Sequence, residues 1–314
     1  MHKVVCYIAG FILHAAIFSL CACDYNSTDT KTSAPSVSAQ TDQQINANKA
    51  VKSKNFDDSI LDFKELYTDE DNLADGAYQV EKRQKTLWLK DAETDADVTY
   101  VVLKRHGKII NTFEGVHYPL GNDARFALFP LLGQNTKQLI VEEAHREWQS
   151  WVVDLSAAAK IIFDSGDYPV GHSLRRIDID GDGKYELIQS SLSFWFFGRL
   201  NNVDSPFIDI VFVYNPTLQK YVPANPQFQD FALRNIEDDI QKAQEIKAES
   251  SAPGQDGGKL GAVLKVVLSY LYAGKEQEAW SFYESEYNLP DKEEIKGTVK
   301  EAVSKDNVYK VLKK

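Results

Sequence analysis

The segment "RRIDIDGDGKYELIQSS", from Arg175 to Ser191, places four carboxylates between two apolar runs. These are the side chains of Asp178, Asp180, Asp182 and Glu186. Four carboxylates in one short loop repel one another strongly unless a cation lies between them. Calcium takes six to eight oxygen ligands at about 2.3–2.6 Å, whereas magnesium uses fewer protein ligands and retains more water. The segment therefore predicts one calcium ion with a structural role, and a solvated charged turn is the alternative.

The positions of the acidic residues and glycines in this loop indicate which type of calcium site it resembles. Gly183 stands at the sixth position, where a tight turn needs a positive φ. An EF-hand requires a glutamate at the twelfth position, where this chain has Gln189, and the flanks are strand-like. The pattern D-x-D-G-D-G-x-x-D/E, followed by apolar Leu187, resembles the calcium loop of FG-GAP or VCBS repeats. The resemblance covers about a dozen residues without a second copy, so it does not support a multi-bladed propeller. It implies five ligands, the fourth through its backbone carbonyl: Asp178, Asp180, Asp182, Lys184 and Glu186.

The N-terminal residues have the pattern of a bacterial export signal. A short basic start precedes the apolar run Val4–Leu20, which has the length of a signal-peptide core. The following "LCAC" resembles the lipobox of bacterial lipoproteins, with Ala22 directly before Cys23, although Cys21 departs from the usual small residue without a thiol. The resemblance implies a signal peptide over residues 1–22 and lipidation, for example with palmitate, on Cys23. An uncleaved membrane anchor or ordinary secretion is the alternative.

The resemblance also implies a location. Acyl chains on Cys23 would hold the chain at a membrane of the bacterial cell envelope, facing the periplasm. Asp24 resembles an inner-membrane retention signal, but the choice between inner and outer membrane stays open. Residues 23–55 are rich in Ser, Thr, Asn, Gln and Lys, which predicts a disordered tether. All three cysteines lie within the first 23 residues, so the remaining chain contains no disulfide or thiolate metal site.

The rest of the chain predicts an α+β fold in two domains. Residues 56–226 begin with Phe56, Ile60, Phe63 and Leu66 at helical spacing and continue as ten short runs rich in β-branched and aromatic residues. This pattern predicts an antiparallel meander, either a sandwich or a partial propeller, with the calcium loop inside it. Residues 227–314 predict a C-terminal helical bundle.

Two further segments are candidates for function. In "EEAHREW", strand alternation would place Glu143, His145 and Glu147 on one face, as half of a metal site or as a general base with its carboxylate; a solvated face is the preferred interpretation. In "SLSFWFFGRL", four successive aromatic residues predict a strand buried on both faces, and an aromatic-lined pocket or partner groove is the alternative: Phe194, Trp195, Phe196 and Phe197.

The charge balance restricts the class of partner. The net charge of −11 excludes nucleic acid and disfavours attachment to an anionic membrane surface through charge. We therefore expect a non-enzymatic binding or scaffolding module, held at the membrane through Cys23, with an envelope protein as its expected partner. The alternative is an envelope hydrolase that uses the acidic loop or the Glu143/His145/Glu147 face.

The lipidation hypothesis predicts the behaviour of one variant. Cys23→Ser removes the thiol to which the lipid would be attached, so the precursor should remain uncleaved and unlipidated. Labelling cells with radioactive palmitate and comparing the mobility of precursor and mature chain would measure both effects. Normal maturation of this variant would contradict the hypothesis.

Overall fold

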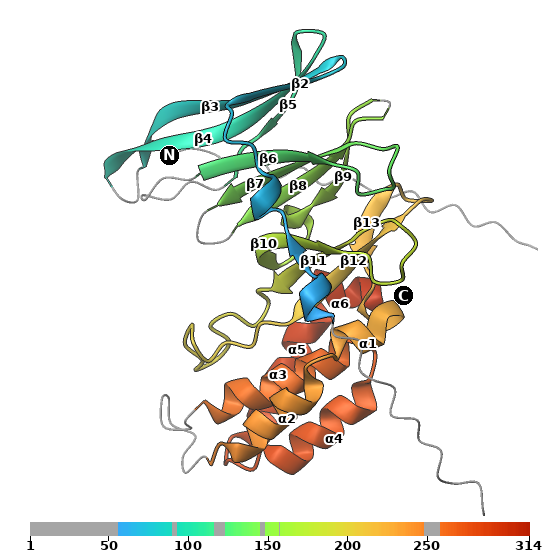
Figure 1. Cartoon of the computed structure of the whole chain (residues 1–314). Coiled ribbons are helices and arrows are strands. Elements are labelled where there is room, and N and C mark those ends of the chain that lie inside the picture. Colours follow the sequence, from blue (N-terminus) through green and yellow to red (C-terminus); the bar gives the residue numbers. More distant parts are fainter. Residues whose placement is uncertain (1–55, 90–92, 116–122, 145–147, 157, 248–257) are drawn as a thin grey trace, which may run out of the picture. The chain divides into compact units, whose positions relative to one another are not determined.

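The structure, a computed structural model, describes residues 56–314 except for 90–92, 116–122, 145–147, 157 and 248–257. The predicted signal peptide, Cys23 and the predicted tether lie outside the described residues. The described residues all belong to one compact unit, Lys52–Lys314. Its strands form three antiparallel sheets and its C-terminal part is helical, which confirms the predicted α+β class (Figure 1).

Each sheet is built mainly from strands that follow one another in the sequence. Sheet A has the order β1-β10-β11-β12-β13, sheet B the order β2-β3-β4-β5, and sheet C the order β6-β7-β8-β9. The strands of sheet A are β1 (Leu61–Asp62), β10 (Val170–Ile177), β11 (Glu186–Ser191), β12 (Asp209–Asn215) and β13 (Lys220–Pro223). Those of sheet B are β2 (Asn72–Asp75), β3 (Tyr78–Leu89), β4 (Thr94–Arg105) and β5 (Lys108–Phe113). Those of sheet C are β6 (Asp123–Phe129), β7 (Gln138–Ala144), β8 (Gln149–Asp154) and β9 (Lys160–Asp164).

Side chains on the two faces of β7 pack against sheet B on one side and sheet A on the other. Leu139 and Val141 lie in an apolar cluster with side chains of sheet B such as Val101. Ile140, which points the opposite way, lies in a second cluster with Leu174 and other side chains of sheet A. Both faces of β7 are therefore covered, which explains why this strand is apolar at successive positions rather than at alternate ones.

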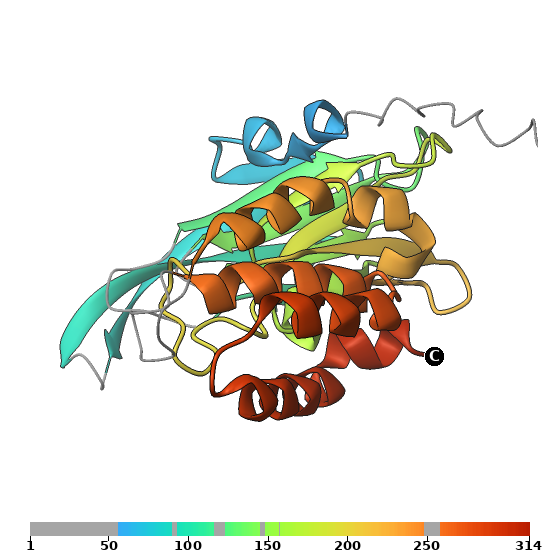
Figure 2. The same ribbon diagram turned by 90° about the horizontal axis from the view of Figure 1, so that it is seen from below.

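The helical part follows β13 and shares a core with the strands. The helices are α1 (Gln229–Ala232), α2 (Ile236–Glu245), α3 (Lys259–Tyr272), α4 (Glu276–Glu286), α5 (Lys292–Lys305) and α6 (Asn307–Leu312). Val263 and Val267 of α3 belong to the same apolar cluster as Phe212 of β12. The orange and red helices lie side by side in Figure 2. None of the described helices combines the length and the apolar character that crossing a bilayer requires.

The segment Phe56–Tyr67, which we call the N-terminal strap, does not form the short helix that the spacing of its apolar residues indicates. It contains two single turns of 3₁₀ helix, η1 (Asp57–Ser59) and η2 (Lys64–Leu66), on either side of β1. Phe63 is fully buried, while Leu66 is 37% exposed. The helical spacing was misleading, because these apolar side chains pack against separate parts of the folded unit and do not form one face of a helix.

A cation–π contact fixes the strap to two sheets. The guanidinium carbon of Arg176, on β10, lies 4.7 Å from the ring centre of Phe63 and 4.5 Å from that of Phe129, on β6. The same guanidinium donates a hydrogen bond of 2.7 Å to the carbonyl of Asp62. Arg176 is only 6% exposed, so these contacts replace much of the water that its charge would otherwise bind.

The buried strap residue gives a stability prediction. Phe63→Ala removes a fully buried ring, so the free energy of unfolding should fall by about 3–5 kcal/mol. Leu61→Ala, at a side chain that is 45% exposed, is the control and should change it by less than about 0.5 kcal/mol. Urea denaturation of both variants measures the difference, and equal effects would contradict the anchoring role of Phe63.

Candidate metal centre

The acidic loop Asp178–Tyr185 joins the antiparallel strands β10 and β11. The last paired residues before and after it are Ile177 and Glu186, so Asp178 and Glu186 lie at the base of the same turn. Gly181 and Gly183 have φ values of +78° and +80°, which permit the tight curvature at low cost. The expected strand–loop–strand arrangement is present, without the helices of an EF-hand.

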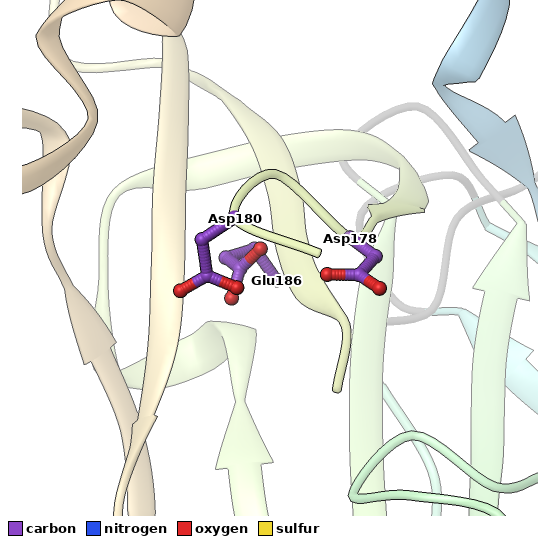
Figure 3. Close-up of side chains that lie close together, drawn as sticks. All are labelled: Asp178, Asp180 and Glu186. Atoms are coloured by element: carbon purple, nitrogen blue, oxygen red, sulfur yellow. The ribbon is translucent and has the colours of Figure 1, made fainter. Parts of the chain in front are cut away.

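Three of the four carboxylates gather at this turn. Asp178, Asp180 and Glu186 each offer one oxygen, and these three oxygens lie within 4.8 Å of one another. In Figure 3 the carboxylates of Asp180 and Glu186 lie next to each other, and that of Asp178 faces them across the loop. Oxygen atoms at this separation are close enough to bind one metal ion together after small side-chain adjustments.

Backbone N–H groups hold these carboxylates in place. Gly181 and Gly183 donate hydrogen bonds of 2.8 and 3.0 Å to the two oxygens of Asp178. The backbone N–H of Asp182 donates to Asp180 over 3.1 Å. The backbone N–H of Ile179 donates to Glu186 over 2.8 Å. The loop therefore orients its own ligands before any ion is added, which lowers the conformational cost of binding.

Glu186 is the buried member of the group. Its exposed fraction is 3%, against an exposed Asp180 and a half-buried Asp178. Burial, together with the charges of Asp180 and Asp178, raises the pKa of Glu186 to about 7. A nearby cation would therefore stabilise the ionised form of Glu186 more than it would stabilise the exposed carboxylates.

Asp182 and Lys184, the other two predicted ligands, are arranged differently. The carboxylate of Asp182 accepts hydrogen bonds from the backbone N–H of Lys184 over 2.8 Å and from its ammonium group over 2.7 Å. These hydrogen bonds hold the pKa of Asp182 below its usual range. The structure thus brings three of the predicted side chains together and pairs the fourth with the lysine beside it.

The hairpin that bears this group is attached to the body next to the loop. The backbone N–H of Tyr185 donates to the carbonyl of Leu131 over 2.9 Å, and the hydroxyl of Tyr221 donates to the carbonyl of Tyr185 over 3.0 Å. Ile179, between the first two aspartates, packs in a cluster with Phe56 of the strap. The order of the loop is therefore linked to sheet C, to β13 and to the strap.

The second predicted site is only partly described. His145 and Glu147 lie outside the described residues, so the grouping with Glu143 remains a prediction. The expectation of a solvated face is wrong for Glu143, which is 1% exposed and accepts a hydrogen bond from the backbone N–H of Gly115. Burial raises the pKa of Glu143 to about 7. Strand alternation could not reveal this burial, because sheets cover both faces of β7.

A buried polar cluster that the sequence did not indicate surrounds the neighbouring Glu142. This carboxylate is fully buried and accepts hydrogen bonds from the hydroxyl of Tyr67, the backbone N–H of Leu174 and the hydroxyl of Ser150. Burial raises its pKa to about 7, although the hydrogen bonds oppose the rise. Glu142 thereby joins sheet C, β10 and the strap through one side chain.

Comparison of the chain with protein-family models, with curated protein sequences and with solved structures finds no match in any of the three.

The raised pKa of Glu142 predicts a pH dependence of stability. A carboxyl group whose folded-state pKa lies above its ordinary value stabilises the fold below about pH 4.5, and this contribution is lost as the pH rises through about 7. Wild-type protein should therefore be less stable at pH 8 than at pH 5. Glu142→Gln should reduce that fall by about 2–3 kcal/mol.

Urea denaturation at the two pH values measures this effect. Glu301→Gln, at an exposed glutamate, is the matched control and should leave the difference between pH 5 and pH 8 as in the wild type. An unchanged pH dependence in Glu142→Gln would contradict a raised pKa of the buried Glu142 carboxyl group.

Proposed function

We propose that the Asp178/Asp180/Glu186 group binds one calcium ion, which clamps the β10–β11 hairpin. The observation that carries the proposal is the convergence of three carboxylate oxygens within 4.8 Å in a two-glycine turn. Calcium suits an all-oxygen site with flexible geometry, and backbone carbonyls and water can complete its six to eight ligands. Magnesium demands a stricter octahedral arrangement, which a turn with one buried and one exposed carboxylate supports less well.

The role of the ion in this proposal is structural. Asp178 directly follows β10 and Glu186 opens β11, so an ion between them joins the ends of two paired strands. The three carboxylates accept hydrogen bonds from the backbone of their own loop. That arrangement supports an ion-holding turn better than a proton-transfer site, in which a carboxylate would face a substrate.

At the level of the whole chain, we propose a non-enzymatic binding or scaffolding module of the bacterial cell envelope. The support is the lipobox-like sequence before Cys23, followed by a polar stretch to residue 55. An acyl anchor with a long polar connection would display the folded unit at a distance from a membrane. An envelope protein is the proposed partner.

The calcium proposal predicts a change in thermal stability. Calcium at 100 times its dissociation constant should stabilise the folded unit by about 2.7 kcal/mol, because a ligand that binds only the folded state adds its binding free energy to that of folding. Differential scanning calorimetry with calcium and with EDTA measures the rise in melting temperature. Asp180→Ala, which removes the side-chain oxygen, should abolish the rise.

Two further variants make this test specific. Asp95→Asn removes one exposed negative charge from β4 and should keep the full calcium response. Asp182→Asn should keep most of it, because the structure pairs that carboxylate with Lys184. A calcium response that survives in Asp180→Ala, or that is absent from the wild type, would contradict the proposal.

A further inference from the structure

The N-terminal strap pairs with the strand that leads into the acidic loop. The strap is the blue segment of Figure 1, and its strand β1 pairs with the end of β10, with Leu61 opposite Arg176 and Asp62 opposite Arg175. Only one residue separates Arg176 from Asp178, the first carboxylate of the loop. The backbone of the strap therefore supports β10 directly before the loop begins.

A side-chain contact joins the strap to the loop itself. Ile179 lies between Asp178 and Asp180 in the sequence, and its side chain is only 9% exposed. It belongs to an apolar cluster with Phe56, the first residue of the strap, which is exposed to the same extent. The ring of Phe56 also packs edge-on against that of Phe231 on α1, with ring centres 5.4 Å apart. A residue of the acidic loop thus helps to hold the start of the strap.

The backbone of Ile179 is connected to the candidate ligands. Its N–H donates a hydrogen bond of 2.8 Å to the carboxylate of Glu186. Its two neighbours in the chain, Asp178 and Asp180, supply the other two converging carboxylates. Because the backbone and side chain of one residue move together, the positions of these carboxylates and the apolar contact with Phe56 do not vary independently.

An ion pair adds to the attachment of the strap at this end. The guanidinium of Arg234 donates to Asp57 over 2.8 Å and to Asp209, on β12, over 2.7 Å. The side chain of Asp57 is 58% exposed, so water weakens its ion pair with Arg234. Burial of an aromatic side chain contributes more than an exposed ion pair does. The contact of Phe56 is therefore the stronger attachment of the two.

The other end of the strap is held by a different part of the molecule. The hydroxyl of Tyr67 donates to Glu142 on β7, and the backbone N–H of Thr68 donates to the carbonyl of Phe126 on β6 over 3.2 Å. These partners belong to sheet C and not to the acidic loop. A change of order in the loop therefore acts first on the start of the strap.

We propose that calcium binding at the acidic loop is coupled to docking of the start of the strap, through the contact between Ile179 and Phe56. This inference rests on the proposed calcium site and gives that site a regulatory role. Without an ion, repulsion among the three carboxylates favours loop conformations in which they separate, and these move Ile179 away from Phe56. An ion holds the carboxylates together and so favours the docked strap.

The coupling acts in both directions. If calcium favours the docked strap, the docked strap must raise the affinity for calcium by the same factor. Coupled sites in proteins usually change each other's affinity by about 5–150-fold. One contact between an aromatic and an aliphatic side chain belongs at the lower end of this range, so we expect a factor of about five.

The position of the strap in the chain gives the coupling a consequence. The strap directly follows residues 23–55, the predicted tether to the membrane. Release of residues 56–62 would lengthen the connection by at most roughly 20 Å, because an extended chain spans about 3.3–3.6 Å per residue. In the proposed arrangement, calcium thus limits how far the folded unit extends from the membrane.

Hydrogen–deuterium exchange of the full chain, followed by mass spectrometry, tests the effect of calcium on the strap. Calcium should slow exchange of the backbone amides of residues 56–62 about fivefold, because exchange there requires the strap to open. Exchange in β3, in sheet B, should stay the same. Asp180→Ala should abolish the protection of the strap.

Titration calorimetry with calcium tests the reciprocal effect. Phe56→Ala keeps every carboxylate of the loop and should weaken calcium binding about fivefold. Leu61→Ala, also on the strap but outside the cluster with Ile179, is the matched control and should leave the dissociation constant unchanged. Ile179→Ala removes the same contact from the loop side. The double variant should therefore bind calcium no more weakly than the weaker of the two single variants.

The outcomes separate the coupling from the calcium site itself. If calcium binds equally well to the wild type and to Phe56→Ala, or leaves exchange of the strap unchanged, the coupling is overturned and the calcium site stands. An equal loss of affinity in Leu61→Ala also overturns the coupling. If the wild type binds no calcium, the proposed function fails and the coupling fails with it.

Discussion

Electrostatic repulsion among the carboxylates at the turn of the β10–β11 hairpin is the constraint that this part of sheet A has to accommodate. Sheet A is assembled around this hairpin, since β10 also pairs with β1 and β11 with β12. Its turn carries the three converging carboxylates, and Glu186 is buried among them. Backbone N–H groups offset part of the repulsion, but a hydrogen bond does not supply a full positive charge. A divalent cation would do so at the point where the two strands meet.

The junctions between sheets rely on buried polar groups as well as on apolar packing. Arg176 contacts rings from the strap and from β6, and Glu142 receives donors from the strap, β8 and β10. A buried charge is costly unless its partners satisfy it, so these contacts favour one arrangement of the sheets over alternatives with the same apolar contacts. The strap contributes to both junctions, and it is the segment that connects the body to the predicted tether.

The sequence predicted most strands correctly because β-branched and aromatic runs bounded by turn residues are a local signal. It expected β10 only as the strand that flanks the acidic loop, because the strand's own residues His172, Ser173, Arg175 and Arg176 are polar and its conformation depends on pairing with β11. It predicted a strand through Phe196, where tertiary hydrogen bonds instead impose a positive φ. Neither feature is encoded in neighbouring residues alone.

For the candidate site, spacing identified the loop and its carboxylates, but it could not show how each is paired. When ligands are assigned from a sequence pattern, alternate side chains of the loop are taken to point toward the same ion. In the structure Asp182 pairs with Lys184, while Asp178, Asp180 and Glu186 converge. A crystal structure determined with calcium would show, by the anomalous scattering of the ion, whether calcium lies among these three carboxylates. One ion should lie about 2.3–2.6 Å from an oxygen of each of the three residues; a calcium-saturated crystal without an ion there would contradict the calcium proposal.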